Sequence, residues 1–403
     1  MVKVAVLGYG TVGSGVVEVI EGNNAEVSRK AGDELHVKYI LDLRDFPEDP
    51  YGDRVIHDFN TILNDSEISV VCEVMGGVGD AYRYTKQCLE AGKSVCTSNK
   101  ELVAKHGAEF LEMAAKNHCN YMFEASVGGG IPIIRPINSA LTAEKILEVK
   151  GIVNGTTNYI LTKMEKEGAN YADVLKKAQE LGYAERNPEA DVEGYDACRK
   201  IAILASLVTG KNVDSEKIFT EGITKIEISD FKFAAAAGMT IKLLAACRAM
   251  EDGSVLAMVA PFMLPRDNPL AMVNDVFNGV LVTGNMLGDA LFYGRGAGKL
   301  PTASAVVADV IDCARHQGKT VICMWEREEA RLADAAETQR RFFVRAKSEA
   351  GADVEAAFPG GESFSAPECP GELGYFTPAV KEKEFFEKYQ ELGDKVLGRI
   401  RLV

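Results

Sequence analysis

An acidic loop followed by an apolar helix holds the residues best suited to acid–base chemistry. The loop, GYAERNPEADVEGYDACRK at 182–200, leads into IAILASLV, which is apolar on every face, as a buried helix is. Asp196 and Lys200 are four residues apart, so in a helix they lie on one face, near its N-terminus. The positive end of the helix dipole favours the neutral form of Lys200, whereas Asp196 favours its charged form. The pair therefore predicts a proton donor at the mouth of a buried helix.

The same loop is rich in carboxylates that would suit a small cationic group. Its acidic residues are Glu185, Glu189, Asp191, Glu193 and Asp196. The alternative interpretation is an ordinary acidic surface loop with an exposed i,i+4 salt bridge, and such pairs contribute little to stability. Other parts of the chain must therefore decide between a site and a solvated surface.

The N-terminus carries a glycine-rich turn between a strand and a helix. The strand VKVAVL at 2–7 is followed by GYGTVG at 8–13, which opens the helix SGVVEVIEG. In this G-x-G-x-x-G pattern Gly8 makes the tight turn, Gly10 lets the backbone approach a pyrophosphate, and Gly13 allows close helix packing. A glycine triplet alone is weak support, but its place between a strand and a helix predicts a dinucleotide site.

The second predicted strand ends where the adenosine ribose of a dinucleotide is expected. This strand, HVKYILDL at 36–43, brings Asp42, Arg44 and Asp45 to that end. An acidic side chain there accepts a hydrogen bond from the 2′-hydroxyl of NAD, whereas an arginine pairs with the 2′-phosphate of NADP. Because both types are present, the sequence leaves the choice between NAD and NADP open.

Two further strands alternate with helices, as a doubly wound sheet requires. They are predicted at 67–77 and 93–100, and the second brings Lys100 to the carboxyl edge of the sheet, where ligands bind in open α/β folds. Ser98 or Asn99 can cap the helix that follows, which leaves Lys100 at a helix N-terminus that disfavours its charge. We expect Lys100 to belong to the site; the alternative is a solvated lysine after a strand.

Three later segments contain turns of interest. Residues 120–134 are predicted as a strand that ends in three glycines, which would equally suit a hinge. Residues 146–168 are predicted as a strand, the polar NGTTN turn and a helix that Thr156 or Thr157 can cap. The turn GRGAG at 294–298 opens another apolar helix.

Composition excludes several classes of protein. The chain has 403 residues, 47% of them hydrophobic, which is enough for two or three domains with their own cores. A net charge of −14 and a pI near 5.0 argue against nucleic-acid binding. No apolar run is long enough for a membrane span and the N-terminus has no targeting pattern, so we expect a soluble, cytoplasmic protein. Nine cysteines without a CxxC pair and five histidines without HxxxH spacing predict neither disulfides nor a transition-metal site.

These elements predict an α/β protein in three parts. Residues 1–135 are expected to form a Rossmann-type doubly wound domain, completed by a helix at about 300–320. Residues 136–299 are expected to form a central α+β domain for substrate binding and dimerisation. Residues 336–403 are expected to form a small C-terminal α+β appendage around a Gly/Pro-rich middle.

The chain resembles homoserine dehydrogenase over roughly residues 1–320. Six segments carry the resemblance, in the order found in that family: VLGYGTVG, SNKELV, FEASVGGGIPII, GIVNGTTNYIL, LGYAE with DVEGYDACRKIAILA, and YGRGAGKLPTASAVVADV. The resemblance implies NAD(P)-dependent interconversion of L-aspartate 4-semialdehyde and L-homoserine, on the route to threonine, methionine and isoleucine. It also implies a homodimer formed through the central domain, or a higher homo-oligomer.

The resemblance assigns roles to individual residues. It implies that Lys200 donates a proton to the carbonyl oxygen and that Lys100 lies between nicotinamide and substrate. The residues expected to hold the cofactor are, with Arg44 from the second strand, Gly8, Gly10, Thr11, Val12, Gly13, Lys100 and Gly298. Those expected to hold the substrate are Thr156, Glu185, Asp191 and Asp196. Backbone oxygens of Glu124, Val127, Gly129 and Ile131 are expected to bind a monovalent cation, usually sodium.

Two alternatives to this function are open at the level of sequence. One is another Rossmann oxidoreductase acting on an amino acid, such as an aspartate dehydrogenase type, which gives no reason for the two lysines Lys100 and Lys200. The other is a protein that senses a dinucleotide without turnover. The two lysines together with the three carboxylates speak against it.

The C-terminal segment departs from the family pattern. Many members carry a regulatory ACT domain of βαββαβ form there, whereas residues 336–403 show only a partial βαβ-like pattern. None of the chemistry-bearing motifs lies in this segment, and its apolar residues need a packing partner. We therefore expect an assembly element, dispensable for catalysis, and little inhibition by threonine.

Overall fold

The protein divides into two compact units, each assembled from separate parts of the chain. The structure is a computed structural model that describes all 403 residues. The first unit consists of Met1–Lys145, Ala202–Ser215 and Gly294–Ala330. The second consists of Ile146–Ile201, Glu216–Tyr293 and Arg331–Val403. None of the helices combines the length and the hydrophobicity that crossing a lipid bilayer requires.

The first unit is built on a parallel sheet of six strands in the order β3-β2-β1-β4-β5-β6. The strands are β1 (Val2–Leu7), β2 (Leu35–Leu41), β3 (Val55–Ile56), β4 (Ile68–Glu73), β5 (Ser94–Thr97) and β6 (Tyr121–Met122). The central strands β1 and β4 are almost entirely buried, which explains their continuous apolar sequences. The strand order reverses beside β1, as in the Rossmann fold, and ligands bind beyond the carboxyl ends of the strands at that point. The prediction of an N-terminal doubly wound domain is confirmed.

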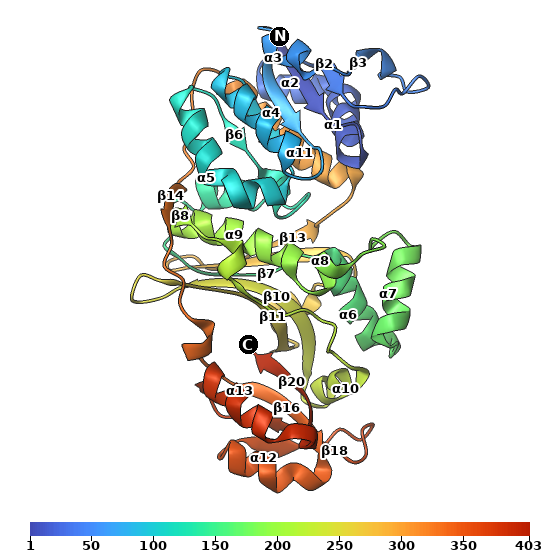
Figure 1. The fold of residues 1–403 in the computed structure, drawn as a ribbon, viewed down its shortest axis with the longest axis vertical. Helices are drawn as coiled ribbons and strands as arrows, with labels where there is room; N and C mark the ends of the chain where they lie inside the picture. The colour runs from blue at the N-terminus through green and yellow to red at the C-terminus, as the bar shows by residue number, and fades with distance from the viewer. The chain divides into compact units, whose positions relative to one another are not determined.

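Helices from two distant parts of the chain cover this sheet. They are α1 (Thr11–Gly22), α2 (Asn24–Ala31), α3 (Phe59–Asn64), α4 (Gly79–Glu90), α5 (Lys100–Lys116) and α11 (Lys299–Arg315). The orange helix α11 packs along α1 among the blue elements of Figure 1. Gly15 of α1 permits this approach, because a Cβ there would lie 2.8 Å from the backbone oxygen of Lys299. Val16 of α1 and Val306 of α11 consequently share one hydrophobic core.

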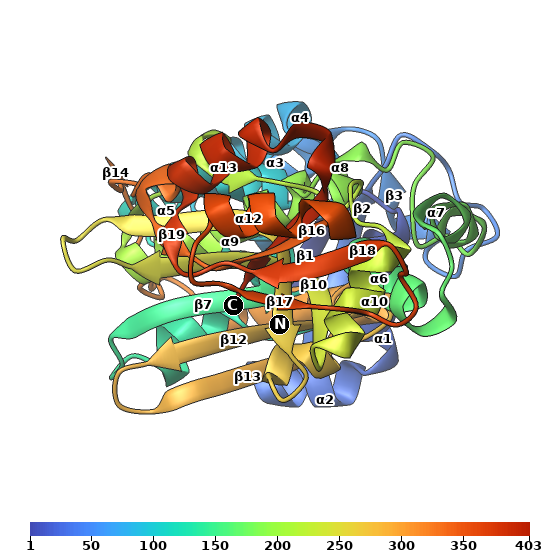
Figure 2. The same ribbon diagram turned by 90° about the horizontal axis from the view of Figure 1, so that it is seen from below.

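The second unit is built on a sheet of ten strands. The order is β13-β12-β7-β10-β11-β20-β16-β18-β17, with β9 beside β11. The strands of its central part are β7 (Ile146–Ile152), β9 (Phe219–Thr220), β10 (Met239–Ala249), β11 (Val255–Pro265), β12 (Phe277–Gly284) and β13 (Gly288–Arg295). The hairpin of β10 and β11 pairs without a register shift from Met239↔Pro265 to Ala249↔Val255. Figure 2 shows β7, β12 and β13 side by side in this sheet.

Five helices accompany the central strands. They are α6 (Gly155–Glu167), α7 (Tyr171–Glu180), α8 (Glu189–Val192), α9 (Tyr195–Thr209) and α10 (Ile228–Ala236). α9 begins in the second unit and belongs to the first from Ala202 onward. Its residues 201–205 are at most 1% exposed, which confirms the prediction of a buried helix after the acidic loop.

The residues after 336 form a complete βαββαβ unit, so the expectation of a partial βαβ pattern is wrong. The elements are β16 (Phe342–Lys347), α12 (Gly351–Ala357), β17 (Glu362–Phe364), β18 (Glu372–Phe376), α13 (Glu382–Glu391) and β20 (Val396–Leu402). The pattern is hard to see in the sequence because β17 has only three residues, ESF, and lies between glycines and prolines. Phe342 stacks on Phe385 with ring centroids 3.6 Å apart, which packs α13 against β16.

The C-terminal strands continue the central sheet. β20 pairs in parallel with β11 through Phe262↔Arg401 and Met263↔Leu402, and antiparallel with β16. The change of composition near residue 336 therefore falls inside one compact unit and one sheet, not at the edge of a separate appendage. Two short ribbons complete the fold: β8 (Lys211–Asn212) with β14 (Glu326–Glu329), and β15 (Gln339–Arg340) with β19 (Val380–Lys381).

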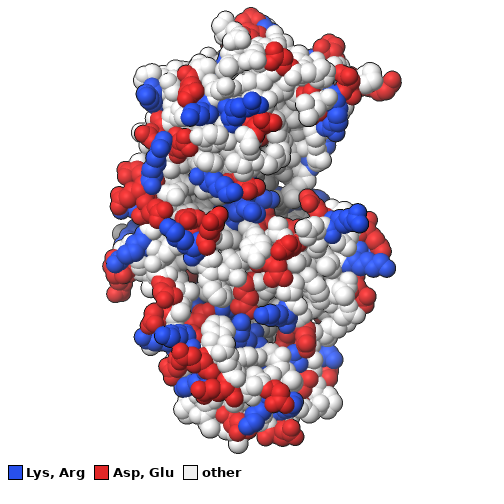
Figure 3. All heavy atoms as spheres, viewed as in Figure 1, with Lys and Arg blue, Asp and Glu red and all other residues white.

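Charged side chains of both signs are interspersed on the surface that Figure 3 displays. The chain has 59 Asp and Glu residues against 45 Lys and Arg residues. On the displayed face the basic residues are not gathered into one area. A surface that follows a nucleic-acid backbone is expected to be continuous and basic. The displayed face does not have that character.

Candidate active site

The first part of the candidate site is the glycine turn between β1 and α1. Gly8 has a φ of +94°, a left-handed conformation that favours glycine. A Cβ at Gly13 would lie 1.9 Å from the carbonyl oxygen of Gly8, so only glycine fits at that position. At Gly10, the N-cap of α1, a Cβ would meet nothing within 4 Å. The turn is therefore closed on the helix side and open at Gly10, where an anion can meet the N–H groups of the helix N-terminus.

A cavity of about 480 Å³ opens beside this turn and is lined in part by Gly10, Asp42, Arg44, Met75, Gly76 and Tyr84. The Asp42 carboxylate, just after β2, accepts hydrogen bonds from the guanidinium of Arg44 at 2.9 Å and from the backbone N–H of Tyr9 at 2.8 Å. The bond from Arg44, followed by that from Tyr9, outweighs burial and holds the pKa of Asp42 well below its usual value. An ionised Asp42 and an exposed Arg44 thus meet at the end of β2, as expected for a ribose site.

A buried carboxylate ties two loops of this unit together. The carboxylate of Glu73, at the end of β4, accepts hydrogen bonds from the Thr97 hydroxyl at 2.6 Å and from the backbone N–H of Met75 at 2.9 Å. Burial raises the pKa of Glu73 to about 7, although these hydrogen bonds oppose the shift. Met75 lines the cavity and Thr97 leads to Lys100, so Glu73 fixes both loops. Glu73 is not among the site residues predicted from the sequence. The one available signal was a single acidic residue at the end of an apolar strand.

Lys100 is the first residue of α5, at the carboxyl edge of the sheet. Of the two predicted capping residues, Asn99 is the cap, since its side chain accepts a hydrogen bond from the backbone N–H of Leu102 at 3.1 Å. Gly298 has the equivalent place before α11, as the N-cap of that helix, with a φ of +123°. Both predicted cofactor residues therefore lie at helix N-termini of the first unit.

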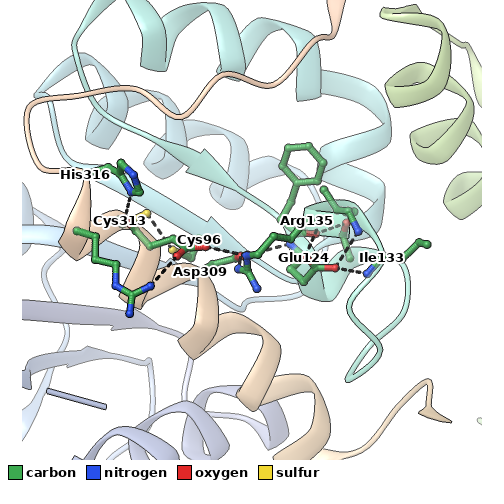
Figure 4. A network of polar contacts seen from close by, with 12 residues as sticks. Cys96, Glu124, Ile133, Arg135, Asp309, Cys313 and His316 are labelled. Atoms are coloured by element: carbon green, nitrogen blue, oxygen red, sulfur yellow. Dashed lines mark hydrogen bonds and ion pairs between the residues drawn. The ribbon is translucent and has the colours of Figure 1, made fainter. Parts of the chain in front are cut away.

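The glycine-rich segment after β6 is organised by a buried glutamate. It was predicted as a strand through residue 134, but the strand is limited to Tyr121–Met122, and the prediction is wrong because the Glu124 side chain folds the chain back on itself. Its carboxylate accepts three backbone N–H groups, from Ile133 at 2.6 Å, Ile134 at 2.9 Å and Arg135 at 2.7 Å (Figure 4). The backbone N–H of Glu124 donates to Asp309 of α11, which also pairs with the Arg135 guanidinium at 2.6 Å. Glu124 is thus central to a network that anchors the turn to α11.

The residues expected to bind a cation through backbone oxygens lie in this turn. Val127, Gly129 and Ile131 are buried, and no donor of the protein hydrogen-bonds to their carbonyl oxygens. Gly129 has a φ of +57°, and a Cβ there would lie 2.1 Å from the carbonyl oxygen of Gly296, so the turn is held closely against the GRGAG segment. Buried carbonyl oxygens require a partner. A monovalent cation with oxygen ligands fits this set of groups.

The second unit holds the Lys200 and Asp196 pair on α9. The Nζ of Lys200 donates to the carboxylate of Asp196 at 2.7 Å and to the carbonyl oxygen of Val153 at 2.7 Å. Lys200 is 8% exposed and Asp196 is 3% exposed. The alternative interpretation, an exposed surface salt bridge, does not describe a pair buried to this degree.

Asn154 connects this pair to the acidic loop. Its side-chain oxygen caps α6 by accepting a hydrogen bond from the backbone N–H of Thr157 at 2.9 Å. Its Nδ2 donates to Asp191 at 2.7 Å and to Asp196 at 2.8 Å. One amide thus joins the starts of α6 and α9 to α8. The predicted caps were Thr156 or Thr157, and the prediction is wrong; the available signal was the asparagine itself, since Asn is among the preferred N-caps.

The remaining predicted substrate residues lie around this group. The Thr156 hydroxyl donates to the backbone oxygen of Tyr183 at 2.6 Å, which holds the start of α6 against the acidic loop. Glu185 has an exposed side chain, and its backbone oxygen accepts from Gln179 of α7 at 3.0 Å. The structure therefore joins Asp191, Asp196 and Lys200 by hydrogen bonds, places Thr156 in the adjacent helix turn, and leaves Glu185 on the exposed part of the loop.

Fold and site together define a class of protein. A Rossmann domain with an open glycine turn and a charged pair at the end of β2, in a chain that also holds a buried lysine among carboxylates, is an oxidoreductase that uses a nicotinamide dinucleotide. Comparison with family models gives the particular kind. Residues 8–124 match the NAD-binding domain of homoserine dehydrogenase, and residues 132–311 match the homoserine dehydrogenase domain. The chain belongs to the homoserine dehydrogenase family.

Individual relatives agree with this assignment. The homoserine dehydrogenase of Bacillus subtilis (strain 168) is 43% identical over 318 residues, which cover 77% of this chain and 72% of that protein. The crystal structure of a homoserine dehydrogenase from Thiobacillus denitrificans matches with a TM-score of 0.90 and 32% identity, over 100% of this chain and 98% of that one. A hyperthermophilic archaeal homoserine dehydrogenase, solved in complex with NADPH, matches with a TM-score of 0.64 and 28% identity, over 77% of this chain and 97% of that one. The resemblance drawn from six sequence segments is confirmed.

Proposed function

We propose that this protein interconverts L-aspartate 4-semialdehyde and L-homoserine with a nicotinamide dinucleotide. The observation that carries the proposal is the buried Lys200, hydrogen-bonded to Asp196 within a cluster of carboxylates that Asn154 holds together. Such a cluster offers both a proton donor and a site for an ammonium group. An amino-acid substrate with a reacting carbonyl or hydroxyl oxygen requires both, the donor for its oxygen and the ammonium site for its α-amino group.

The carboxylates are proposed to bind the α-ammonium group of the substrate. Carboxylates such as those of Asp191 and Asp196 attract a cationic group. Asn154 holds the two carboxylates by its amide and keeps them oriented. Glu185, on the exposed part of the loop, is proposed to complete the ammonium site, and Thr156 to contact the substrate from α6.

Lys200 is proposed to move the proton. In the reducing direction its Nζ donates a proton to the carbonyl oxygen, and in the oxidising direction it accepts the proton of the homoserine hydroxyl. The bonds to Asp196 and Val153 fix the direction of Nζ before the substrate arrives. Lys100, at the N-terminus of α5, is proposed to stabilise negative charge on the same oxygen.

The dinucleotide supplies or accepts the hydride when it is bound. The turn from Gly8 to Gly13, including Thr11 and Val12, is proposed to hold its pyrophosphate, and Gly298 to approach it from α11. The ionised Asp42 supports NAD(H) as the preferred cofactor, while the exposed Arg44 allows NADP(H). The archaeal relative solved with NADPH supports the second possibility.

A monovalent cation, sodium by resemblance, is proposed to occupy the turn at residues 124–131. Support comes from the buried residues Val127, Gly129 and Ile131, whose carbonyl oxygens accept no hydrogen bond from the protein. The backbone oxygen of Glu124 would complete the set. The ion would hold the turn in shape and take no part in proton or hydride transfer.

We further infer a cytoplasmic homodimer formed through the central strands. β13 is an edge strand of the large sheet, and its side chains Leu291 and Tyr293 are 42% and 54% exposed. An edge strand with exposed apolar residues invites pairing with another chain. Light scattering at micromolar concentration tests this, and a monomer there would refute it.

Oxidation of L-homoserine, followed in parallel with NAD⁺ and with NADP⁺, tests the proposed function. We expect turnover with L-homoserine and none with L-aspartate, the substrate that an enzyme of the aspartate dehydrogenase type would oxidise. Oxidation of L-aspartate but not of L-homoserine would indicate the aspartate dehydrogenase type. Dinucleotide binding without turnover of either substrate would indicate a sensing protein, and each of these results would overturn the proposal.

A further inference from the structure

Two arginines of the C-terminal strand bind one carboxylate of the central region. Arg399 and Arg401 lie on β20, and both donate to Glu221, which follows β9. Nη1 of Arg401 lies 2.6 Å from Oε2, and Nη1 of Arg399 lies 3.0 Å from Oε1. The side chain of Arg401 is 1% exposed and also donates to Glu382 of α13. Burial favours the neutral form of Glu221, but the two arginines outweigh it and lower the pKa, so that the carboxylate is ionised.

The residues after Glu221 pack directly on the acidic loop. The backbone N–H of Ile223 donates to the carbonyl oxygen of Val192 at 2.8 Å. A Cβ at Gly222 would lie 2.2 Å from the same oxygen, so the two backbones are in contact and only glycine fits. Val192 is the last residue of α8 and follows Asp191. A shift of Glu221 would therefore reach Asp191 through one hydrogen bond and two adjacent residues.

The same segment supports the turn between the two carboxylates. Gly194, between α8 and α9, has a φ of +86°, and a Cβ there would lie 3.1 Å from Thr220 and from Val259. The backbone of Glu221 is tied to the sheet, since its N–H donates to the carbonyl oxygen of Val259 at 2.8 Å. Gly194 is two residues before Asp196. The chain on both sides of this turn thus rests on the segment at 220–223.

We propose that Arg399 and Arg401 are positioning residues that hold the acidic loop in its substrate-binding shape through Glu221. Neither arginine touches a group proposed to react, so the effect falls on affinity for the amino-acid substrate and not on the dinucleotide. Arg401 reinforces the link because its guanidinium also lies 4.8 Å from the ring of Phe219, in the strand just before Glu221. The inference rests on the proposed substrate role of Asp191 and Asp196.

A charge-removing variant of the carboxylate isolates this link. Glu221→Gln keeps the shape of the side chain but removes the anion that the two arginines share, which costs stability in a buried site. We expect the segment at 220–223 to move away and the KM for homoserine to rise by about 3- to 10-fold, a range that corresponds to usual coupling energies. The kcat and the KM for the dinucleotide should change less than about twofold.

A variant of one of the two arginines provides a second, independent test. Arg399→Met removes one of the two charges while Arg401 keeps its bond to Glu382, so the buried core of the C-terminal strands stays intact. We expect it to raise the KM for homoserine as Glu221→Gln does. The double variant should be no worse than the worse single variant, because both changes break the same pair.

Glu227→Gln is the matched control. Glu227 pairs with Arg345 of β16 and so also joins the C-terminal strands to the central region, but it is the N-cap of α10 and its partner is neither Arg399 nor Arg401. It should leave the KM for homoserine unchanged. If Glu221→Gln does not fold, Glu221→Asp provides the same test, since it keeps the charge but withdraws it from both arginines.

Hydrogen exchange separates failure of this inference from failure of the proposed function. In Glu221→Gln the amides of Val192 to Asp196 and of Ile223 should exchange faster than in the wild type, whatever the substrate proves to be. A wild type that oxidises homoserine, with unchanged KM and unchanged exchange in the variant, would overturn the positioning role alone. An equal rise in KM for homoserine and dinucleotide, or additive effects in the double variant, would also overturn it, because both indicate general loosening.

Discussion

The hydroxyl of Thr97 donates a 2.6 Å hydrogen bond to the carboxylate of Glu73, joining the ends of the neighbouring parallel strands β5 and β4. Burial raises the pKa of Glu73 to about 7. The native protein therefore keeps a proton on Glu73 between about pH 4.5 and 7, where the unfolded chain has released it. Because the native state binds more protons in this window, the free energy of unfolding falls as the pH rises through it.

Glu73→Gln tests this relationship. Residue 73 of the variant cannot titrate. The melting temperature of the variant minus that of the wild type should therefore rise by a few degrees as the pH increases from 5 to 8. Calorimetry at a series of pH values measures the difference. Glu26→Gln is the control, because Arg29 and Lys30 lower the pKa of this exposed carboxyl and the same rise should be absent. A flat difference for Glu73→Gln would show that Glu73 ionises normally.

Lys200→Ala should abolish most turnover while leaving the dinucleotide affinity nearly intact. The side chain acts on the substrate oxygen, and general acid catalysis contributes roughly 10²- to 10⁴-fold. Steady-state kinetics and fluorescence titration with the reduced dinucleotide measure the two quantities. Lys163→Ala, on the partly exposed side of α6, is the control. A loss smaller than about tenfold would remove Lys200 from the role of proton donor.

Asn154→Ala should raise the KM for homoserine and also destabilise the protein by about 1 kcal/mol, the usual effect of losing an N-cap. The KM rises because Asp191 and Asp196 lose their common hydrogen-bond donor. Asn170→Ala separates the two effects. Asn170 caps α7 by the same kind of bond, since its side-chain oxygen accepts from the backbone N–H of Asp173, but it is not bonded to Asp191 or Asp196. Equal kinetic effects of the two variants would mean that Asn154 acts only as a cap.

Arg44→Ala should weaken the use of NADP(H) more than that of NAD(H). Only NADP carries the 2′-phosphate that an arginine at this position would bind, and Asp42 remains available for a 2′-hydroxyl. The ratio of kcat/KM for the two dinucleotides is the measurement, with Arg29→Ala as the control. Equal losses with both dinucleotides would show that Arg44 does not contact this end of the cofactor.

A chain that ends at Glu337 should lose stability and activity, contrary to the expectation from composition. Truncation removes β20 from the centre of the large sheet and exposes the edge of β11. It also leaves Glu221 without Arg399 and Arg401. Expression yield, melting temperature and homoserine oxidation measure the outcome. A truncated chain with normal KM for homoserine would contradict both the sheet argument and the proposed positioning role.

The first unit could be predicted from the sequence because its signals are local. The turn at Gly8 to Gly13 follows a strand and precedes a helix, and buried parallel strands are recognisable as apolar runs. The pair of Asp196 and Lys200 was also visible, because its i,i+4 spacing is a property of one helix. In these places the residues that cooperate are close together in the chain.

The parts that escaped prediction depend on residues distant in sequence. Glu124 turns the chain through N–H groups at Ile133 to Arg135, so a segment with strand-like composition is not a strand. Asn154 meets Asp191 and Asp196 only after three helices have packed. β17 escaped because it has only three residues, and the place of β20 in the sheet depends on its pairing with β11. None of these contacts leaves a periodic pattern in the sequence.

The position of α11 has a consequence for how the protein is made. A ribosome delivers β1 to β6 early, but the helix that shares a core with Val16 and Ile20 arrives only after the whole central region has been synthesised. Until then the part of α1 that packs on α11 has no cover, although its other apolar residues can already pack on β1 and β2. The nascent chain is therefore most exposed to aggregation while its second half is still being translated.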